Sequence, residues 1–340
     1  MPTPSDLVRR LRHRTAALAA SRWPLVAAVV GVLVGTGCLI AAMVPVGPEW
    51  LAAVGAIAVS TIYSWGLAAR EGGRPVVFGT LALAIGLTAV LSDQEVLRTG
   101  ASVLTATVAA VLGVMITVPT KGLWAAAREA VVGVVVAAVG ALASIGFEPA
   151  ISVERYEYTT LGLGLIGVFV VVFRLGAGFH GLGRRGMVVV VVGAVLLSLT
   201  LLYAELLRRY GSSSTVDDLL EAVRWSRENL GAFPRPISTV LGVPALVYGC
   251  HLRARRRQGW WVSAFGVAAT APIATALGNP VITVDEALLS IGFSLVVGIL
   301  IGWIVIRLDL LLTGNHGRRR RVAEKLDAIR PEPPRTAALL

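Results

Sequence analysis

Long apolar runs alternate with short polar connectors along almost the whole chain. A helix of roughly 20 apolar residues crosses the roughly 30 Å of hydrocarbon in a bilayer. Ten segments meet or approach that length, so we predict an all-α, polytopic integral membrane protein, a bundle of about ten transmembrane helices. The predicted spans are 24–46, 50–68, 75–91, 101–118, 127–147, 159–178, 187–206, 237–252, 260–277 and 287–306. The eighth holds Pro244 and would be a kinked crossing or a re-entrant segment.

The one long hydrophilic stretch between two strongly apolar segments is 206–236. Within it, Ser214 and Thr215 precede Asp217 and Asp218 at the spacing of a helix start. Apolar residues then recur at helical intervals, at Val216, Leu219, Leu220, Val223 and Leu230. Gly231, followed by prolines, ends the pattern. The stretch therefore predicts one extracytoplasmic amphipathic helix near 215–230, too polar to span a bilayer and suited to lying across its surface.

The chain divides into three parts. Residues 1–23 form a basic N-terminal segment, 24–306 the transmembrane domain, and 307–340 a basic tail. In the tail we expect a turn at 314–317 and then a short basic helix that ends before Pro331. The proline-rich residues that follow are expected to be disordered.

Composition supports a membrane protein. The chain is 56% hydrophobic and only 15% charged, with a mean hydropathy of +0.76, which excludes an ordinary soluble domain. Arginine is abundant but there are only two lysines, and with many Ala, Val and Gly this usage is typical of a GC-rich prokaryotic genome. The predicted location is the plasma membrane.

The charges separate by side. With the N-terminus in the cytoplasm, 24 of the 31 Lys and Arg residues fall in inner segments, and 13 of the 20 acidic residues fall in outer ones. Cytoplasmic loops are enriched in Lys and Arg, so both termini are predicted to be cytoplasmic. The net charge of +11 then reflects topology and predicts no nucleic-acid partner.

Four adjacent arginines in the tail stand beside the membrane: Arg318, Arg319, Arg320 and Arg321. Each attracts anionic lipid by about 1 kcal/mol at a cytoplasmic surface. They would either only fix the topology or recruit anionic lipid or a partner.

Glycine patterns suggest a phosphate or headgroup site only weakly. G-x-G-x-x-G occurs at Gly162-Gly164-Gly167, inside a predicted span, where close helix packing is the simpler explanation. It also occurs twice at the inner end of that span, between Gly176 and Gly186. A phosphate or headgroup site there would use Gly181, Gly183, Arg184 and Arg185.

The amphipathic helix carries the other candidate residues. Asp217, Asp218 and Glu221 with Trp225 would form an outer docking helix. Carboxylates are favoured in the first turn of a helix by its dipole alone. A transferase that uses them would need another carboxylate across a cleft, and the pairs Glu154 with Glu157 and Asp285 with Glu286 are better explained as solvated loop residues.

Metal, cofactor and ion-coupling chemistry find little support. Cys38 and Cys250 fall in different spans, and the four histidines are dispersed, so neither a disulfide nor a metal site is predicted. We expect no cofactor. Ionisable residues inside spans lie only near the ends, where snorkelling or interfacial pairing explains them, namely Arg128, Glu129, Arg174, Glu205 and His251.

The sequence thus favours a non-enzymatic multi-pass membrane protein, a component of cell-envelope assembly or transport that works with membrane partners and contacts anionic lipid at the cytoplasmic face. An alternative is a carrier or flippase for a lipid or small amphiphile, with its site near Pro244, Pro272 and the helix break at 278–280. A membrane-embedded transferase is the third possibility.

Overall fold

The protein is a bundle of helices in the computed structural model, which describes residues 23–44, 47–92, 94–150, 152–177, 186–188, 190–202, 213–254, 259–326 and 332–339. Every regular element in these ranges is a helix, so the all-α prediction is confirmed for them. Seven helical segments are long and apolar enough to cross a membrane. Two shorter apolar helices are α4 and Gly186–Leu202. The described helices thus have the lengths and composition of a membrane protein with several spans.

The helices follow the predicted segments closely. The first half contains α2 (Trp23–Met43), α3 (Trp50–Arg70), α4 (Pro75–Leu91), α5 (Glu95–Met115), α6 (Leu123–Ile145) and α7 (Val153–Val172), which continues as the π-helix η1 (Phe173–Ala177). The second half contains α9 (Ser213–Leu230), the π-helix η2 (Ser238–Gly242), α10 (Val243–Arg253), α11 (Gly259–Ala264), α12 (Val267–Thr270), α13 (Pro272–Leu277) and α14 (Val284–Leu326).

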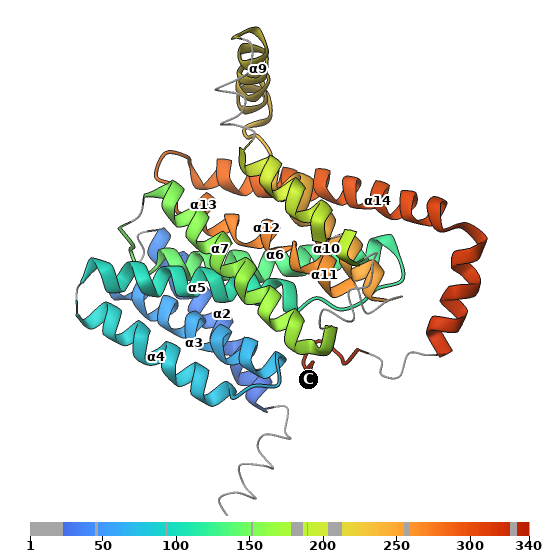
Figure 1. The fold of residues 1–340 in the computed structure, drawn as a ribbon. Helices are drawn as coiled ribbons and strands as arrows, with labels where there is room; N and C mark the ends of the chain where they lie inside the picture. Colours follow the sequence, from blue (N-terminus) through green and yellow to red (C-terminus); the bar gives the residue numbers. More distant parts are fainter. Residues whose placement is uncertain are drawn as a thin grey trace, which may run out of the picture.

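The centre of the bundle is formed by α10 and the broken run α11–α13, around which α5, α6, α7 and α14 pack (Figure 1). In the most apolar stretch of Gly259–Leu277, 94% of the residues are buried, whereas in the corresponding stretch of α2 only 11% are buried. The ninth predicted span is therefore enclosed by protein, whereas α2 packs mainly on α3 and leaves most of its surface free for lipid. Pro272 has no backbone N–H to donate, which accounts for the break between α12 and α13.

Glycines let the helices approach closely. A Cβ added to Gly113 of α5 would lie 2.7 Å from the carbonyl oxygen of Gly133 in α6, and one on Gly133 would lie equally close to that of Gly113. Gly298 and Gly302 have the same packing role, because α14 lies against Val243 and Val247 of α10 at these positions.

The end of the chain differs from the prediction. The turn expected at 314–317 does not form, because α14 continues as one helix over Val284–Leu326. Its 43 residues make it ~65 Å long, about twice the hydrocarbon thickness of a bilayer. Toward its end α14 changes direction beside the bundle, and the chain returns to the bundle after it (Figure 1).

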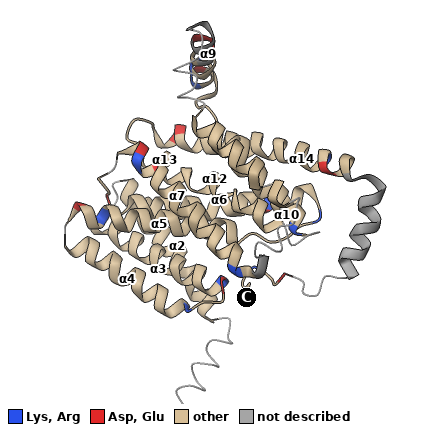
Figure 2. Ribbon diagram, in the orientation of Figure 1, with Lys and Arg blue, Asp and Glu red and all other residues tan. Residues whose placement is uncertain are grey.

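Charged residues gather toward the helix ends and connections, and the middle of the bundle is almost free of them (Figure 2). Ion pairs in the described part join Arg98 to Glu148, Arg128 to Glu129, Arg227 to Glu286, Arg235 to Glu157, Arg253 to Glu332 and Arg335 to Glu129. In each pair both residues belong to segments that the sequence assigns to the same side. We call the two ends of the bundle inner and outer in this sense.

The glycine contact between α5 and α6 gives a stability prediction. Gly113→Ala pushes a methyl group into the Gly133 backbone, and overpacking of this kind typically costs about 1–3 kcal/mol. Gly100→Ala in the same helix meets no atom within 4 Å and is the matched control. We expect thermal unfolding in detergent to show a lower midpoint for Gly113→Ala only. Equal midpoints for the two variants would contradict the packing.

Candidate functional site

Five charged residues from distant parts of the chain meet at the inner end of the bundle. Arg70 ends α3, Glu129 lies in the second turn of α6, and Arg253 ends α10. Glu332 and Arg335 belong to residues 332–339, which we call the C-terminal segment. Together these residues form the inner-end charge cluster.

Arg253 is the most enclosed cation of the cluster, with 1% of its side chain exposed. Its Nη2 donates to the Thr117 carbonyl oxygen at 2.7 Å and to Glu332 Oε1 at 2.6 Å, while Nη1 donates to Thr117 Oγ1 at 2.8 Å. The guanidinium also lies over the ring of Trp260, 3.7 Å from its centroid. Three bundle contacts therefore fix Arg253, and its remaining edge faces Glu332.

Glu129 is fully buried and accepts hydrogen bonds from three directions. Arg335 Nη2 lies 2.9 Å from each of its carboxylate oxygens. The Val118 backbone N–H donates to Oε2 at 3.0 Å, and Arg128 donates to Oε1 at 3.1 Å. A buried carboxylate needs such partners because ionisation away from water is costly. The sequence favours snorkelling or interfacial pairing for Glu129 at a span end, and in the structure Glu129 is paired and buried.

Arg70 holds the backbone of the C-terminal segment. Its Nε donates to the Met115 carbonyl oxygen at 3.0 Å, and its Nη1 donates to the carbonyl oxygens of Pro334 and Ala337 at 2.8 and 2.6 Å. The Leu339 N–H donates in turn to the Arg70 carbonyl oxygen at 2.7 Å. The Nη2 atom of Arg70 is buried and has no hydrogen-bond partner among the described residues.

These contacts concern the tail, whose last residues the sequence predicts to be disordered. In the structure, residues 332–339 contact the bundle through both side chains and backbone. The physical reason is that two buried arginines and a buried carboxylate need counter-charges, and Glu332 and Arg335 supply them. Composition alone does not reveal a pairing between residues more than 200 positions apart.

At the outer end, charged residues form separate pairs rather than one cluster. Arg235, just before η2, lies 3.9 Å from Glu157 and donates to the Pro272 carbonyl oxygen at 3.4 Å. Burial lowers the pKa of the Arg235 guanidinium from its ordinary value, and the charge of Glu157 opposes that shift. Glu148 has a left-handed backbone, with φ of 53°, and pairs with Arg98 at 3.3 Å.

One further carboxylate lies at the inner end, next to Arg70. Burial raises the pKa of the Glu71 carboxyl group, and the charge of Arg174 in η1 opposes the shift. Glu71 follows the last residue of α3, so it sits where the chain leaves the bundle.

The docking residues predicted on the outer helix lie on α9, which stands clear of the bundle and crosswise to α14 (Figure 1). Asp217, Asp218 and Glu221 are exposed, and Trp225 is 58% exposed. In the described part of the chain no three His, Cys, Asp or Glu side chains gather where they could share a metal ion. The amphipathic, extracytoplasmic character of α9 stays a prediction.

The remaining predicted site residues are placed only in part. Gly181, Gly183, Arg184 and Arg185 lie outside the described residues. Arg318 to Arg321 fall within α14, and their side chains are not described. In the upstream glycine pattern, Gly164 and Gly167 pack against Val267 and Val111, which agrees with a packing role.

The broken centre of the bundle holds little free space. The π-turn of η2 presses against α12, and a Cβ on Gly242 would lie 2.1 Å from the Ala269 backbone nitrogen. A cavity beside it, lined by Arg235, Ser238 and Ser294 among others, measures about 10 Å³, room for about one water molecule. Trp261, Ser263 and Thr275 each bury a polar atom that has no hydrogen-bond partner among the described residues.

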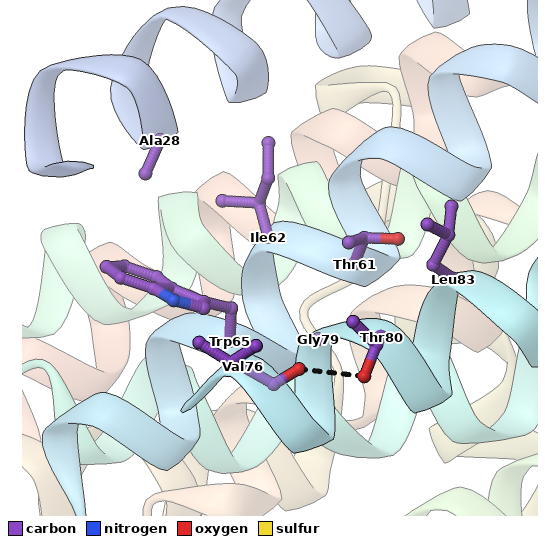
Figure 3. Close-up of a pocket in the computed structure, with 8 residues that line it drawn as sticks. All are labelled: Ala28, Thr61, Ile62, Trp65, Val76, Gly79, Thr80 and Leu83. Atoms are coloured by element: carbon purple, nitrogen blue, oxygen red, sulfur yellow. Dashed lines mark hydrogen bonds between the residues drawn. The ribbon is translucent and has the colours of Figure 1, made fainter. Parts of the chain in front are cut away.

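A larger groove of about 290 Å³ lies on the outside, between α2, α3 and α4 (Figure 3). Ile62, Trp65 and Leu83 line it, and the Thr80 hydroxyl donates to the Val76 carbonyl oxygen at 2.9 Å. Its walls are almost wholly apolar, as expected of a surface that lipid chains cover.

Comparison of the chain with protein-family models, with curated proteins and with solved structures found no match.

The inner-end charge cluster gives a second stability prediction. Glu129→Gln leaves Arg335 opposite a neutral amide in a buried site, and breaking a buried pair costs about 3 kcal/mol or more. Arg128→Gln is the matched control, because the Arg128 side chain is 67% exposed and such pairs contribute little. We expect only Glu129→Gln to lower the thermal midpoint. A drop of the same size in Arg128→Gln would argue against a special role for the buried pair.

Proposed function

We propose that this protein is a non-enzymatic, multi-pass plasma-membrane component that works with membrane partners in cell-envelope assembly or transport, and that α9 is its docking element. The observation that supports this is the isolation of α9. It leaves the bundle while exposing Leu220, Trp225 and Leu230, and the Arg227–Glu286 ion pair at 3.2 Å ties its end to α14. A helix that exposes apolar side chains away from its own core is suited to binding something else.

The two faces of α9 suit two different surfaces. Leu220, Val223 and Leu230 share one side, whereas Trp225 lies about 140° round the helix from Leu220 and so points to the opposite side. A helix on a bilayer buries one apolar face. If the stripe rests on lipid, Trp225 points away from it, beside the exposed carboxylates of Glu221 and Glu228. A protein partner with an apolar pocket and a basic rim fits that surface.

We further infer ten crossings with both termini in the cytoplasm. The separation of ion pairs into two ends supports this arrangement. The eighth segment supports it too, because Arg235 at its start contacts Glu157 and Arg253 at its end contacts Thr117, residues of opposite ends. The α9 helix would then be extracytoplasmic and the C-terminal segment cytoplasmic.

Thiol labelling tests the topology. In a Cys38→Ser background, with Cys250 buried, Asp218→Cys and Thr336→Cys each present an exposed position, and Asp218 lies off the apolar stripe of α9. A membrane-impermeant maleimide should label Asp218→Cys in intact cells, and Thr336→Cys only after permeabilisation. Labelling of Thr336→Cys in intact cells would refute the inferred sidedness.

Photo-crosslinking tests the docking role. A photoreactive amino acid at Trp225 should capture a distinct membrane protein in cells, and Trp225→Ala should reduce recovery of that partner about tenfold or more, as loss of an interface anchor typically does. The matched control is the same photoreactive residue at Val281, which is exposed in another outer segment. Deletion of 215–230 with the partner still recovered in full would refute the proposal.

Carriage of a lipid or small amphiphile through the broken helices stays a prediction from the sequence. It would require α10–α13 to separate around Pro244 and Pro272, both of which are buried.

A further inference from the structure

In the inner-end charge cluster, the bundle itself provides more buried positive charges than buried carboxylates. Arg70 and Arg253 are buried with the C-terminal segment in place, and the bundle sets one buried carboxylate, Glu129, against them. Glu129 has the Val118 N–H and Arg128 as partners of its own. Without the segment, Arg253 loses the carboxylate of Glu332 and Arg70 loses its two carbonyl acceptors, and such a loss is destabilising while the groups stay away from water.

Both guanidinium groups are held in place by the bundle. Arg253 is fixed by Thr117 and by the ring of Trp260, and its outward edge binds the Glu332 carboxylate. Arg70 is fixed through Nε by Met115, which leaves Nη1 for the backbone of the C-terminal segment. Departure of the segment would therefore uncover positioned donors rather than loose side chains. Arginine forks match the oxygens of carboxylates and phosphates.

Arg70 also has an unused hydrogen-bond donor. Its Nη2 is buried and has no hydrogen-bond partner among the described residues, although the charges of Glu332, Arg253 and Arg335 all act on this side chain. A carbonyl oxygen accepts at one edge, whereas a phosphate group carries three terminal oxygens and could accept from both Nη atoms. The C-terminal segment thus leaves the Nη2 donor of Arg70 without an acceptor.

We infer that Arg70 and Arg253, the latter positioned by Thr117 and Trp260, form an oxyanion-binding site for a phosphate group, and that the Glu332 carboxylate of the C-terminal segment occupies its Arg253 side as a built-in competitor. The phosphate belongs to a lipid headgroup or to a soluble ligand, since the same chemistry serves both. The site lies at the end of the bundle that we assign to the cytoplasmic surface, where anionic headgroups concentrate. This inference is independent of the docking role of α9.

Competition predicts that weakening the segment strengthens phosphate binding. A ligand that binds only the open form has an apparent dissociation constant raised by the inverse of the open fraction. Glu332→Gln removes the competing charge without touching the pocket, and deletion of 332–340 removes the competitor entirely. Both variants should bind the probe about tenfold more tightly than the full chain. Glu228→Gln, an exposed carboxylate on α9, is the matched control and should bind like the full chain.

The experiment uses two probes to separate the sources of phosphate. Short-chain phosphatidic acid, with phosphatidylcholine as its neutral counterpart, is counted on the purified protein by native mass spectrometry. Inorganic phosphate is titrated calorimetrically. Tighter binding of phosphatidic acid alone supports a lipid site, and tighter binding of inorganic phosphate supports a soluble ligand.

Substitutions of Arg70 and Arg253 test whether the phosphate binds at these two residues. Arg253→Gln and Arg70→Gln, made in the chain that lacks 332–340, should lose the gain, whereas Arg74→Gln should keep it because Arg74 is exposed at the same end. Arg70→Lys keeps the charge and loses the fork, so it should bind more weakly than Arg70 even if Arg70→Gln fails to fold. The inference is overturned if truncation and Glu332→Gln leave both affinities unchanged. It is also overturned if the pocket variants bind like Arg74→Gln.

Discussion

The inner end of the bundle depends on one requirement, that a carboxylate fully withdrawn from water must be matched by cations and N–H donors. Glu129 meets it with a backbone N–H, a neighbouring arginine and, 206 residues further along the chain, Arg335. The last partner can arrive only if the chain returns to the bundle after α14. Residues 332–339 lie against the inner end and provide this partner, together with the backbone contact from Leu339 to Arg70.

The same end also depends on how tightly the centre is packed. Arg253 reaches Thr117 because α10 is enclosed between α6, α11 and α14, and glycines such as Gly249 and Gly259 leave room for the facing backbone. A Cβ on Gly259 would lie 2.4 Å from the backbone nitrogen of Arg253. Packing by small residues, which is what associates helices in lipid, thus sets the position of the charges as well as the fold.

The periodic and apolar features of the sequence predicted the helices well. The starts of α3 and α4 at Trp50 and Pro75 were both anticipated, because tryptophan and proline mark the ends of apolar runs. Gly231 ends α9 with a positive φ, again as its type suggests. What local patterns missed is tertiary. Residues 314–317 continue a helix despite two glycines, and the proline-rich C-terminal segment is ordered by partners that only the fold brings near.

The long separation between Glu129 and Arg335 has a consequence for biosynthesis. At a translation rate of about 5–20 residues per second, the arginine follows the carboxylate by about 10–40 s. During that interval all later hydrophobic segments are delivered to the membrane, while Glu129 has only Arg128 and Val118 as neighbours. Closure of the inner end then comes late in maturation, after the last part of the chain has been made, and until then Glu129 lacks its Arg335 partner.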